Sequence, residues 1–159
     1  MNTQVILKNP MHRSGFALAG AQDTLDAWGR GEVSDTNNDG IVTAEEVGGL
    51  KLGETKLVVL SACETGVGKS RSGKGVLGLR RGFILAGAQH LMMTLWPVTD
   101  EITPKIMVDF HKEFQKGNNA PQALVDVQRT WLVKLRKERG LCDAVTIAGP
   151  FILSSQGNQ

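Results

Sequence analysis

The chain has 159 residues, of which 41% are hydrophobic, enough for one domain with its own core. Its 18 basic and 16 acidic residues give a net charge of +2, too small to indicate binding to nucleic acid or to an acidic surface. No apolar run reaches the roughly 18 residues of a membrane-spanning helix, and the N-terminus does not resemble a signal peptide. Because two cysteines do not make a disulfide framework, we expect a reducing, cytoplasmic compartment.

The first half of the chain leads to one buried strand. Residues 14–22 are small and apolar, and predict a short helix or a buried loop. Residues 35–40 read DTNNDG, a turn by composition, and Thr43 to Glu46 (TAEE) have the signature of a capping box. Residues 56–62, KLVVLSA, form an apolar run without alternation, which is typical of a strand buried on both faces of a parallel sheet.

The second half predicts helices and two further strands. We expect a helix over residues 76–87, a buried strand over 90–96 that Pro97 ends, and a last strand over 144–153. Between the two strands, one helix begins at Thr103 and Pro104, and a longer one runs from about Pro121 to Gly140. This order predicts an α/β fold with flanking helices, right-handed crossovers and a mostly parallel sheet. Such a sheet needs more strands, so we expect the domain to be truncated at its N-terminal side.

Cys63 directly follows the first buried strand, where open parallel sheets carry their chemistry. Gly66 and Gly68 allow the backbone to turn away, which leaves the thiol accessible and lets backbone N–H groups face a developing oxyanion. A thiol beside an imidazole becomes a strong nucleophile near neutral pH. By position alone, a small buried cysteine that ends the strand is the better explanation, and the surrounding motif has to decide.

The motif LVVLSACETGVG, together with GKGVLGLRRGFILAGAQHLMMTLWPVTDE, resembles the nucleophile region of the CHAT peptidases. These are caspase-like domains related to separase and often joined to TPR repeats. NPMHRSGFALAGA and DGIVTAEEV resemble upstream family segments in the expected order, so the likeness covers roughly residues 9–135. The resemblance implies that residues 1–159 are the C-terminal, nucleophile-bearing part of a single caspase-like domain.

The resemblance further implies a cysteine endopeptidase that cleaves a protein substrate, with Cys63 as nucleophile and its backbone N–H as an oxyanion donor. The family's general base is a histidine upstream of the segment matched here by NPMHRSG, and this sequence has no such motif. We therefore expect this chain alone to be inactive. His12, His90 and His111 each have a structural explanation. Glu64 and Asp100 are candidates for a pocket that binds a basic P1 side chain, although a solvated loop charge is the simpler explanation for each.

A second motif fits the EF-hand loop, D-x-[DN]-x-[DN]-G-x₅-E, at every specified position. Its Ca²⁺ ligands would be Asp35, Asn37, Asp39, the Ile41 carbonyl, Thr43 and Glu46. The flanking sequences are poor helices, and in the CHAT family a similar segment is a turn and a capped helix without calcium. Both interpretations of this loop remain open.

A non-catalytic docking module, ordered by Ca²⁺, is the alternative to a peptidase. The absence of the upstream histidine motif favours the docking module, whereas the intact SACETG motif favours the enzyme. For either function the resemblance implies a regulatory TPR-type domain or partner. We expect no required cofactor, no nucleic acid and no membrane among the partners.

Overall fold

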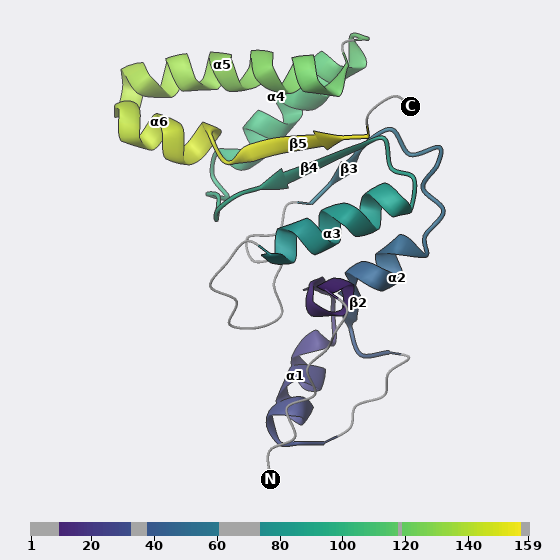
Figure 1. Cartoon of the computed structure of the whole chain (residues 1–159). Coiled ribbons are helices and arrows are strands. Elements are labelled where there is room, and N and C mark those ends of the chain that lie inside the picture. Colours follow the sequence, from purple (N-terminus) through teal and green to yellow (C-terminus); the bar gives the residue numbers. More distant parts are fainter. Residues whose placement is uncertain (1–9, 33–37, 61–73, 118, 157–159) are drawn as a thin grey trace. The chain divides into compact units, whose positions relative to one another are not determined.

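The computed structural model describes residues 10–32, 38–60, 74–117 and 119–156, which form a mixed α/β fold (Figure 1). These residues belong to two units, and the chain passes from one to the other more than once. Unit 1 comprises residues 1–54 and 64–88, and unit 2 comprises residues 55–63 and 89–159. The strands that are expected to carry the chemistry belong to unit 2.

Unit 1 contains a two-stranded antiparallel ribbon and three α-helices. Its elements are the 3₁₀ helix η1 (Pro10–Arg13), β1 (Gly15–Ala17), α1 (Ala21–Gly29), β2 (Ile41–Thr43), α2 (Ala44–Gly48) and α3 (Lys74–Leu85). Gly15 of β1 lies opposite Thr43 of β2, and Ala17 lies opposite Ile41. Part of the segment 14–22 is therefore a strand, and the expectation of a short helix or loop was wrong there. Its partner lies 26 residues along the chain, beyond the reach of a local pattern.

Helix α2 begins as the sequence predicts. Thr43 is its N-cap, and its hydroxyl accepts a hydrogen bond from the backbone N–H of Glu46, whose side chain in turn accepts from the N–H of Thr43. The capping box is thus confirmed. Helix α2 then packs closely on α3, because a Cβ at Gly82 would lie only 2.4 Å from the carbonyl oxygen of Ala44.

Unit 2 contains a three-stranded sheet in the order β3-β4-β5. Its elements are β3 (Val58–Val59), β4 (His90–Thr94), α4 (Thr103–Gln115), α5 (Ala120–Arg139), α6 (Leu141–Ala148) and β5 (Phe151–Ser155). Strands β3 and β4 are parallel, with Val58 opposite Leu91, as expected. Strand β5 is antiparallel to β4, with Phe151 opposite Thr94. The described sheet is therefore mixed rather than mostly parallel.

The C-terminal apolar run was only partly a strand. Residues 144–148 belong to α6, and β5 begins at Phe151. A short apolar run predicts a buried helix and a buried strand equally well, and here the ends are set by Gly140 and Gly149, which flank α6. Helix α6 leads the chain back to the carboxyl end of β4, where Phe151 pairs with Thr94. Strand β5 therefore runs in the opposite direction to β4.

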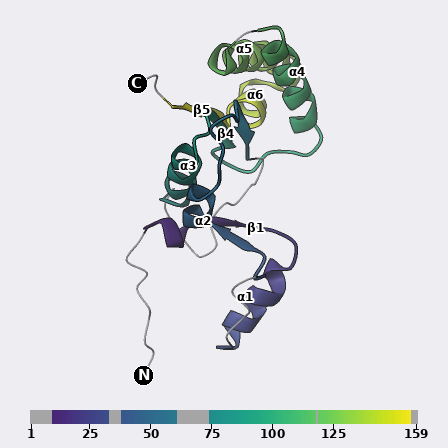
Figure 2. The ribbon, with the colours of Figure 1, turned by 90° about the vertical axis from the view of Figure 1, so that its right-hand side faces the viewer.

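The core of unit 2 lies between the sheet and the three helices α4, α5 and α6, which gather on one side of it (Figures 1 and 2). Met92 and Phe151 contribute from the strands, while Phe110 and Trp131 contribute from α4 and α5. Asn119 caps α5, because its side chain accepts a hydrogen bond from the N–H of Gln122. The helices expected from Thr103 and from about Pro121 are confirmed within one or two residues. Thr103, expected as the N-cap of α4, is instead a buried residue of its first turn, because Ile102 is the N-cap and no side chain caps this helix.

Candidate functional site

Strands β3 and β4 end at the same edge of the sheet because they run parallel. The backbone N–H of Leu60 donates to the carbonyl oxygen of Met92 at 2.9 Å, so the pairing continues to the last described residue before Cys63. Cys63 and Glu64 themselves lie outside the described residues. The structure describes the chain as far as Leu60, at the carboxyl edge of β3 and β4.

The loop that leaves β4 is fixed at this edge by two hydrogen bonds. The N–H of Leu95 donates to the carbonyl oxygen of Pro150 at 3.0 Å, and the indole Nε1–H of Trp96 donates to the carbonyl oxygen of Thr146 at 2.9 Å. Asp100 follows in the same loop, where it is exposed and forms no ion pair with any described residue. Its carboxylate is therefore accessible to a cation from outside, as a pocket for a basic side chain requires.

His90 lies at the other end of the sheet from this edge. Thr94 lies four positions after His90 on β4, which corresponds to about 13 Å at the rise of a strand. Its Nδ1 lies 2.9 Å from the hydroxyl oxygen of Ser155 on β5. Partial burial lowers the pKa of His90 below its ordinary value of 6.5, so the ring is neutral at pH 7. The position and the hydrogen bond give His90 a structural role in the sheet.

The other two histidines are also engaged with neighbouring side chains. In unit 1, Nε2 of His12 contacts the carboxylate of Glu45, which joins η1 to α2. In unit 2, His111 is exposed on α4, and its ring meets the edge of Phe110 with 5.5 Å between the ring centres. Within unit 2, His90 is thus held at the opposite end of β4 from the carboxyl edge.

The EF-hand-like loop is described only in its second half, since Asp35 and Asn37 lie outside the described residues. Gly40 has φ +69°, the left-handed turn that the motif's glycine provides, and Oδ1 of Asp39 accepts from the N–H of Ile41 at 2.8 Å. Oε2 of Glu46 accepts from the N–H of Thr43 at 2.7 Å and from its hydroxyl at 2.8 Å. One carboxylate oxygen of Glu46 thus serves the helix cap.

No group of three or more His, Cys, Asp or Glu side chains is arranged to hold a metal ion within residues 10–32, 38–60, 74–117 and 119–156. Across the same ranges, no helix combines the length and the apolar character needed to cross a membrane. The described half of the EF-hand-like loop therefore does not form a metal site by itself, and the two other side-chain ligands of the motif, Asp35 and Asn37, lie outside the described residues.

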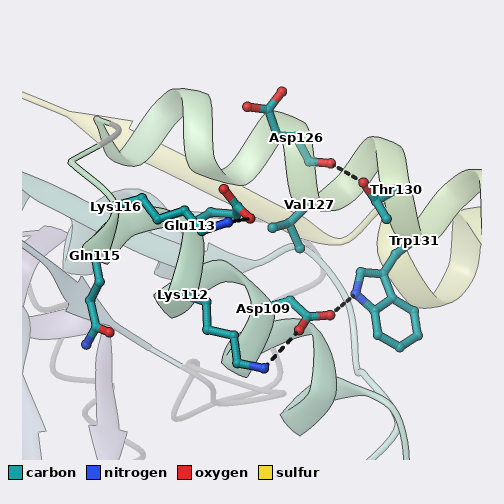
Figure 3. A pocket seen from close by; sticks show the side chains of 9 residues that line it. All are labelled: Asp109, Lys112, Glu113, Gln115, Lys116, Asp126, Val127, Thr130 and Trp131. Atoms are coloured by element: carbon teal, nitrogen blue, oxygen red, sulfur yellow. Dashed lines mark hydrogen bonds and ion pairs between the residues drawn. The ribbon is translucent and has the colours of Figure 1, made fainter.

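A groove of about 550 Å³ lies between α4 and α5 (Figure 3). Its lining is mostly charged, and comprises Asp109, Lys112, Glu113, Gln115, Lys116, Asp126, Val127, Thr130 and Trp131. Lys116 pairs with Glu113 at 2.6 Å, and the hydroxyl of Thr130 donates to the carbonyl oxygen of Asp126 at 2.9 Å. The charged side chains and the hydroxyl of the groove thus each have a partner within unit 2.

Two contacts at these sites were not anticipated from the sequence. Glu45 was read only as a first-turn residue of a capped helix, and no local signal connects it to His12, 33 residues earlier. Trp96 was read as the end of a buried strand, whereas its indole holds the outgoing loop against α6. The only local signal for this hydrogen bond is a tryptophan that precedes a proline at the end of a strand.

These features define an α/β protein in which the first of two parallel strands, β3, is followed in the sequence by the cysteine-bearing segment. A family model described as "CHAT domain" matches residues 2–143, and the chain belongs to this family. The chain is also 33% identical over 89 residues to "Tetratricopeptide repeat protein 28" of Homo sapiens, an alignment that covers 56% of this chain and 4% of that protein. The chain thus spans a small part of this relative's length. No solved structure matches it.

Proposed function

We propose that this chain carries the nucleophile-bearing part of a caspase-like cysteine endopeptidase domain, with Cys63 as the nucleophile. The Cys63 thiolate attacks the carbonyl carbon of the scissile peptide bond, and backbone N–H groups, including that of Cys63, stabilise the oxyanion. The amine leaves with a proton from an imidazolium ion, and water then hydrolyses the thioester. A histidine outside this chain supplies the imidazole.

The family match over residues 2–143 is the observation that carries this proposal, because CHAT domains are related to caspase-like peptidases. The parallel pair of β3 and β4 adds support, since it leads the chain to Cys63 from the carboxyl edge of a sheet. A mostly parallel, caspase-like sheet would then need further strands beyond those that the structure describes.

The positions of the three histidines support a base from elsewhere. His90 is at the amino end of β4 and bonded to Ser155, and His12 is engaged by Glu45. A thiol that lacks its general base loses catalysis worth about 10²–10⁴-fold. The chain alone is therefore a very poor peptidase, and its activity depends on the complete domain.

The substrate is a protein, and the residue before the scissile bond is basic. Asp100 supports this preference, because it is exposed in the loop that leaves the carboxyl edge of the sheet. Glu64 is the second carboxylate of the proposed pocket. Since a protein similar to this chain is a tetratricopeptide repeat protein, a regulatory TPR-type domain or partner is part of the proposal.

The test is thiol labelling of the full-length protein that contains these residues. A peptide acyloxymethyl ketone with arginine at P1 is incubated with the wild type, with Cys63→Ser and with Cys142→Ser, and mass spectrometry locates the adduct. Cys142 is exposed on α6 and serves as the internal reference for an ordinary thiol. The proposal expects labelling of Cys63 at least about 100-fold faster than that of Cys142. Equal, slow labelling of both thiols contradicts it.

A non-catalytic docking module ordered by Ca²⁺ is the second candidate. The left-handed Gly40 and the strand Ile41–Thr43 that leads into a capped helix favour it, because an EF-hand loop has these features at the same positions. The same labelling experiment separates the two functions, since a docking module gives Cys63 no reactivity beyond that of Cys142.

A further inference from the structure

The outer face of α5 consists of Val125, Arg129, Val133 and Arg136, which are all exposed. Their spacing of four, four and three residues places them on one side of the helix, opposite the buried Ala123, Leu124, Val127, Trp131 and Leu135. Val125 is 47% exposed and Val133 is 53% exposed. Figure 1 shows α5 as the outermost helix of its layer in unit 2.

The presence of two valines and two arginines on this exposed face is not explained by the stability of α5. Valine is a poor helix former, and leaving it half exposed forgoes most of the gain from burial. Basic residues stabilise the C-terminal turn of a helix, but Arg129 lies in the middle of α5. Arg129 and Arg136 have no hydrogen bond or ion pair with any residue that the structure describes, whereas Arg139 bonds Glu101 and Lys134 lies 4.6 Å from the ring centre of Trp131.

The charge on α5 is strongly biased. Five of its residues are basic, namely Arg129, Lys134, Arg136, Lys137 and Arg139, and only Asp126 and Glu138 are acidic. Asp126 accepts a hydrogen bond from Gln122 on the preceding turn, so its carboxylate is already engaged. An arginine beside a half-exposed valine, repeated along one helix face, offers a partner both ion pairs and apolar contact.

We propose that the outer face of α5 is a docking surface for an acidic, amphipathic α-helix of a partner domain. The 12 residues from Val125 to Arg136 extend about 16 Å along the helix, which matches three turns of a partner helix. Carboxylates of the partner pair with Arg129 and Arg136, and aliphatic side chains cover Val125 and Val133. Two isolated valines are too small an apolar area for a membrane surface, and a net charge of +2 for the whole chain does not favour nucleic acid.

This inference does not depend on the proposed function. Docking on α5 requires neither a reactive Cys63 nor a catalytic histidine, because every residue of the surface lies on one described helix. If the chain proves to be part of a peptidase, an acidic helix at this face is a means of attaching a regulatory domain.

Binding of a synthetic peptide to the full chain tests the proposal. The probe is an 18-residue amidated helix with leucine at every third or fourth position and glutamate beside each leucine, and it carries a fluorophore for anisotropy. One control peptide has lysine in place of every glutamate, and another has glutamine in place of every leucine. Only the first peptide is expected to bind, with an affinity that falls as the salt concentration rises.

Matched variants on two helices locate the surface. Arg129→Glu is compared with Lys105→Glu on α4, since both residues are exposed and both substitutions change the net charge equally. Val133→Ser is compared with Val108→Ser, because Val108 is 51% exposed on α4. We expect Arg129→Glu to weaken binding about tenfold and Val133→Ser about fivefold, with little effect from either α4 variant. Circular dichroism confirms that all four variants fold.

Several results would overturn the docking surface. Equal losses from Arg129→Glu and Lys105→Glu would mean that only the net charge matters. A wild-type affinity in Val133→Ser would remove the apolar part of the proposal. Tighter binding to vesicles with 30% phosphatidylserine, or to a 20-mer of single-stranded DNA, with the same dependence on Arg129 and Val133, would assign the face to a membrane or to nucleic acid instead.

Discussion

The indole Nε1–H of Trp131 donates a 3.0 Å hydrogen bond to Oδ2 of Asp109, and this bond ties α5 to α4 in the core layer of unit 2 (Figure 3). The ring of Trp131 is only 7% exposed, whereas the side chain of Asp109 is 46% exposed. The bond therefore lies at the boundary between the core and the solvent, where a charged acceptor keeps a buried donor satisfied.

Replacing Asp109 tests the contribution of this bond. We expect Asp109→Ala to lower the free energy of unfolding by about 1 kcal/mol, because the buried indole N–H loses its acceptor while Asp109 is partly solvated. Urea unfolding of Asp109→Ala, Trp131→Phe and the double variant gives the coupling energy. Purely additive losses would mean that the bond contributes nothing.

Gly82→Ala is expected to destabilise unit 1, although alanine normally improves a helix interior by about 1 kcal/mol. The added Cβ would lie 2.4 Å from the carbonyl oxygen of Ala44 and would force α3 away from α2. Gly29→Ala on α1 is the control, because no atom lies within 4 Å of its added Cβ. Thermal unfolding should show a lower Tm for Gly82→Ala and an unchanged or higher Tm for Gly29→Ala. A stabilised Gly82→Ala would contradict the close packing of α2 on α3.

The cap of α2 depends on the hydroxyl of Thr43. Thr43→Ala should reduce the free energy of unfolding by about 1 kcal/mol, since the N–H of Glu46 loses its acceptor. Thr43→Ser keeps the hydroxyl and should remain close to the wild type. Chemical denaturation measures both variants, and equal stability of the two would refute the capping role.

Glu46→Gln separates the cap from the proposed calcium site. Glutamine preserves a capping box, so the stability without metal should be unchanged, but it removes the charged ligand that Ca²⁺ requires. If the loop binds Ca²⁺, isothermal titration of the wild type releases heat and raises its Tm, and Glu46→Gln loses both effects. A wild type that shows neither heat nor a shift in Tm removes calcium from the docking alternative.

The neutral state of His90 makes unit 2 sensitive to acid. Burial lowers the pKa of His90 in the folded state below 6.5, so the unfolded chain binds more protons between the two pKa values. The free energy of unfolding therefore decreases as the pH falls below 6.5. Below the folded-state pKa of His90, both states bind the proton, so His90 causes no further decrease. His90→Asn should lose this slope. Urea midpoints of both proteins between pH 5 and pH 8 measure it, and parallel curves would exclude His90 as the cause.

Much of the secondary structure follows from local sequence. The capping box at Thr43, the strand at His90–Thr94 and the two helices α4 and α5 were all predicted from caps, apolar runs and helical spacing. Each of these signals depends on groups within about four residues of one another, so the sequence contains the whole interaction. The candidate nucleophile likewise came from a continuous motif, and its position in space lies outside the described residues.

The secondary-structure predictions were wrong where contacts between distant residues decide whether a segment is a helix or a strand. Residues 144–148 are as apolar as a strand requires, yet they form α6, which packs against α5. The antiparallel direction of β5 follows from that helix rather than from any residue within the strand. In the same way, β1 exists because it pairs with β2, and the alternatives of helix or loop were equally consistent with its composition.

The sequence by itself determined the family motif around Cys63, the capping box of α2 and the buried strand β4, since each is a pattern of neighbouring residues. Only the tertiary structure decided the mixed sheet, the contact of His12 with Glu45, and the contact of His90 with Ser155. These relationships join residues that are 33 and 65 positions apart. They form only when burial of the core compensates for the entropy of closing such long loops, a balance that no local pattern records.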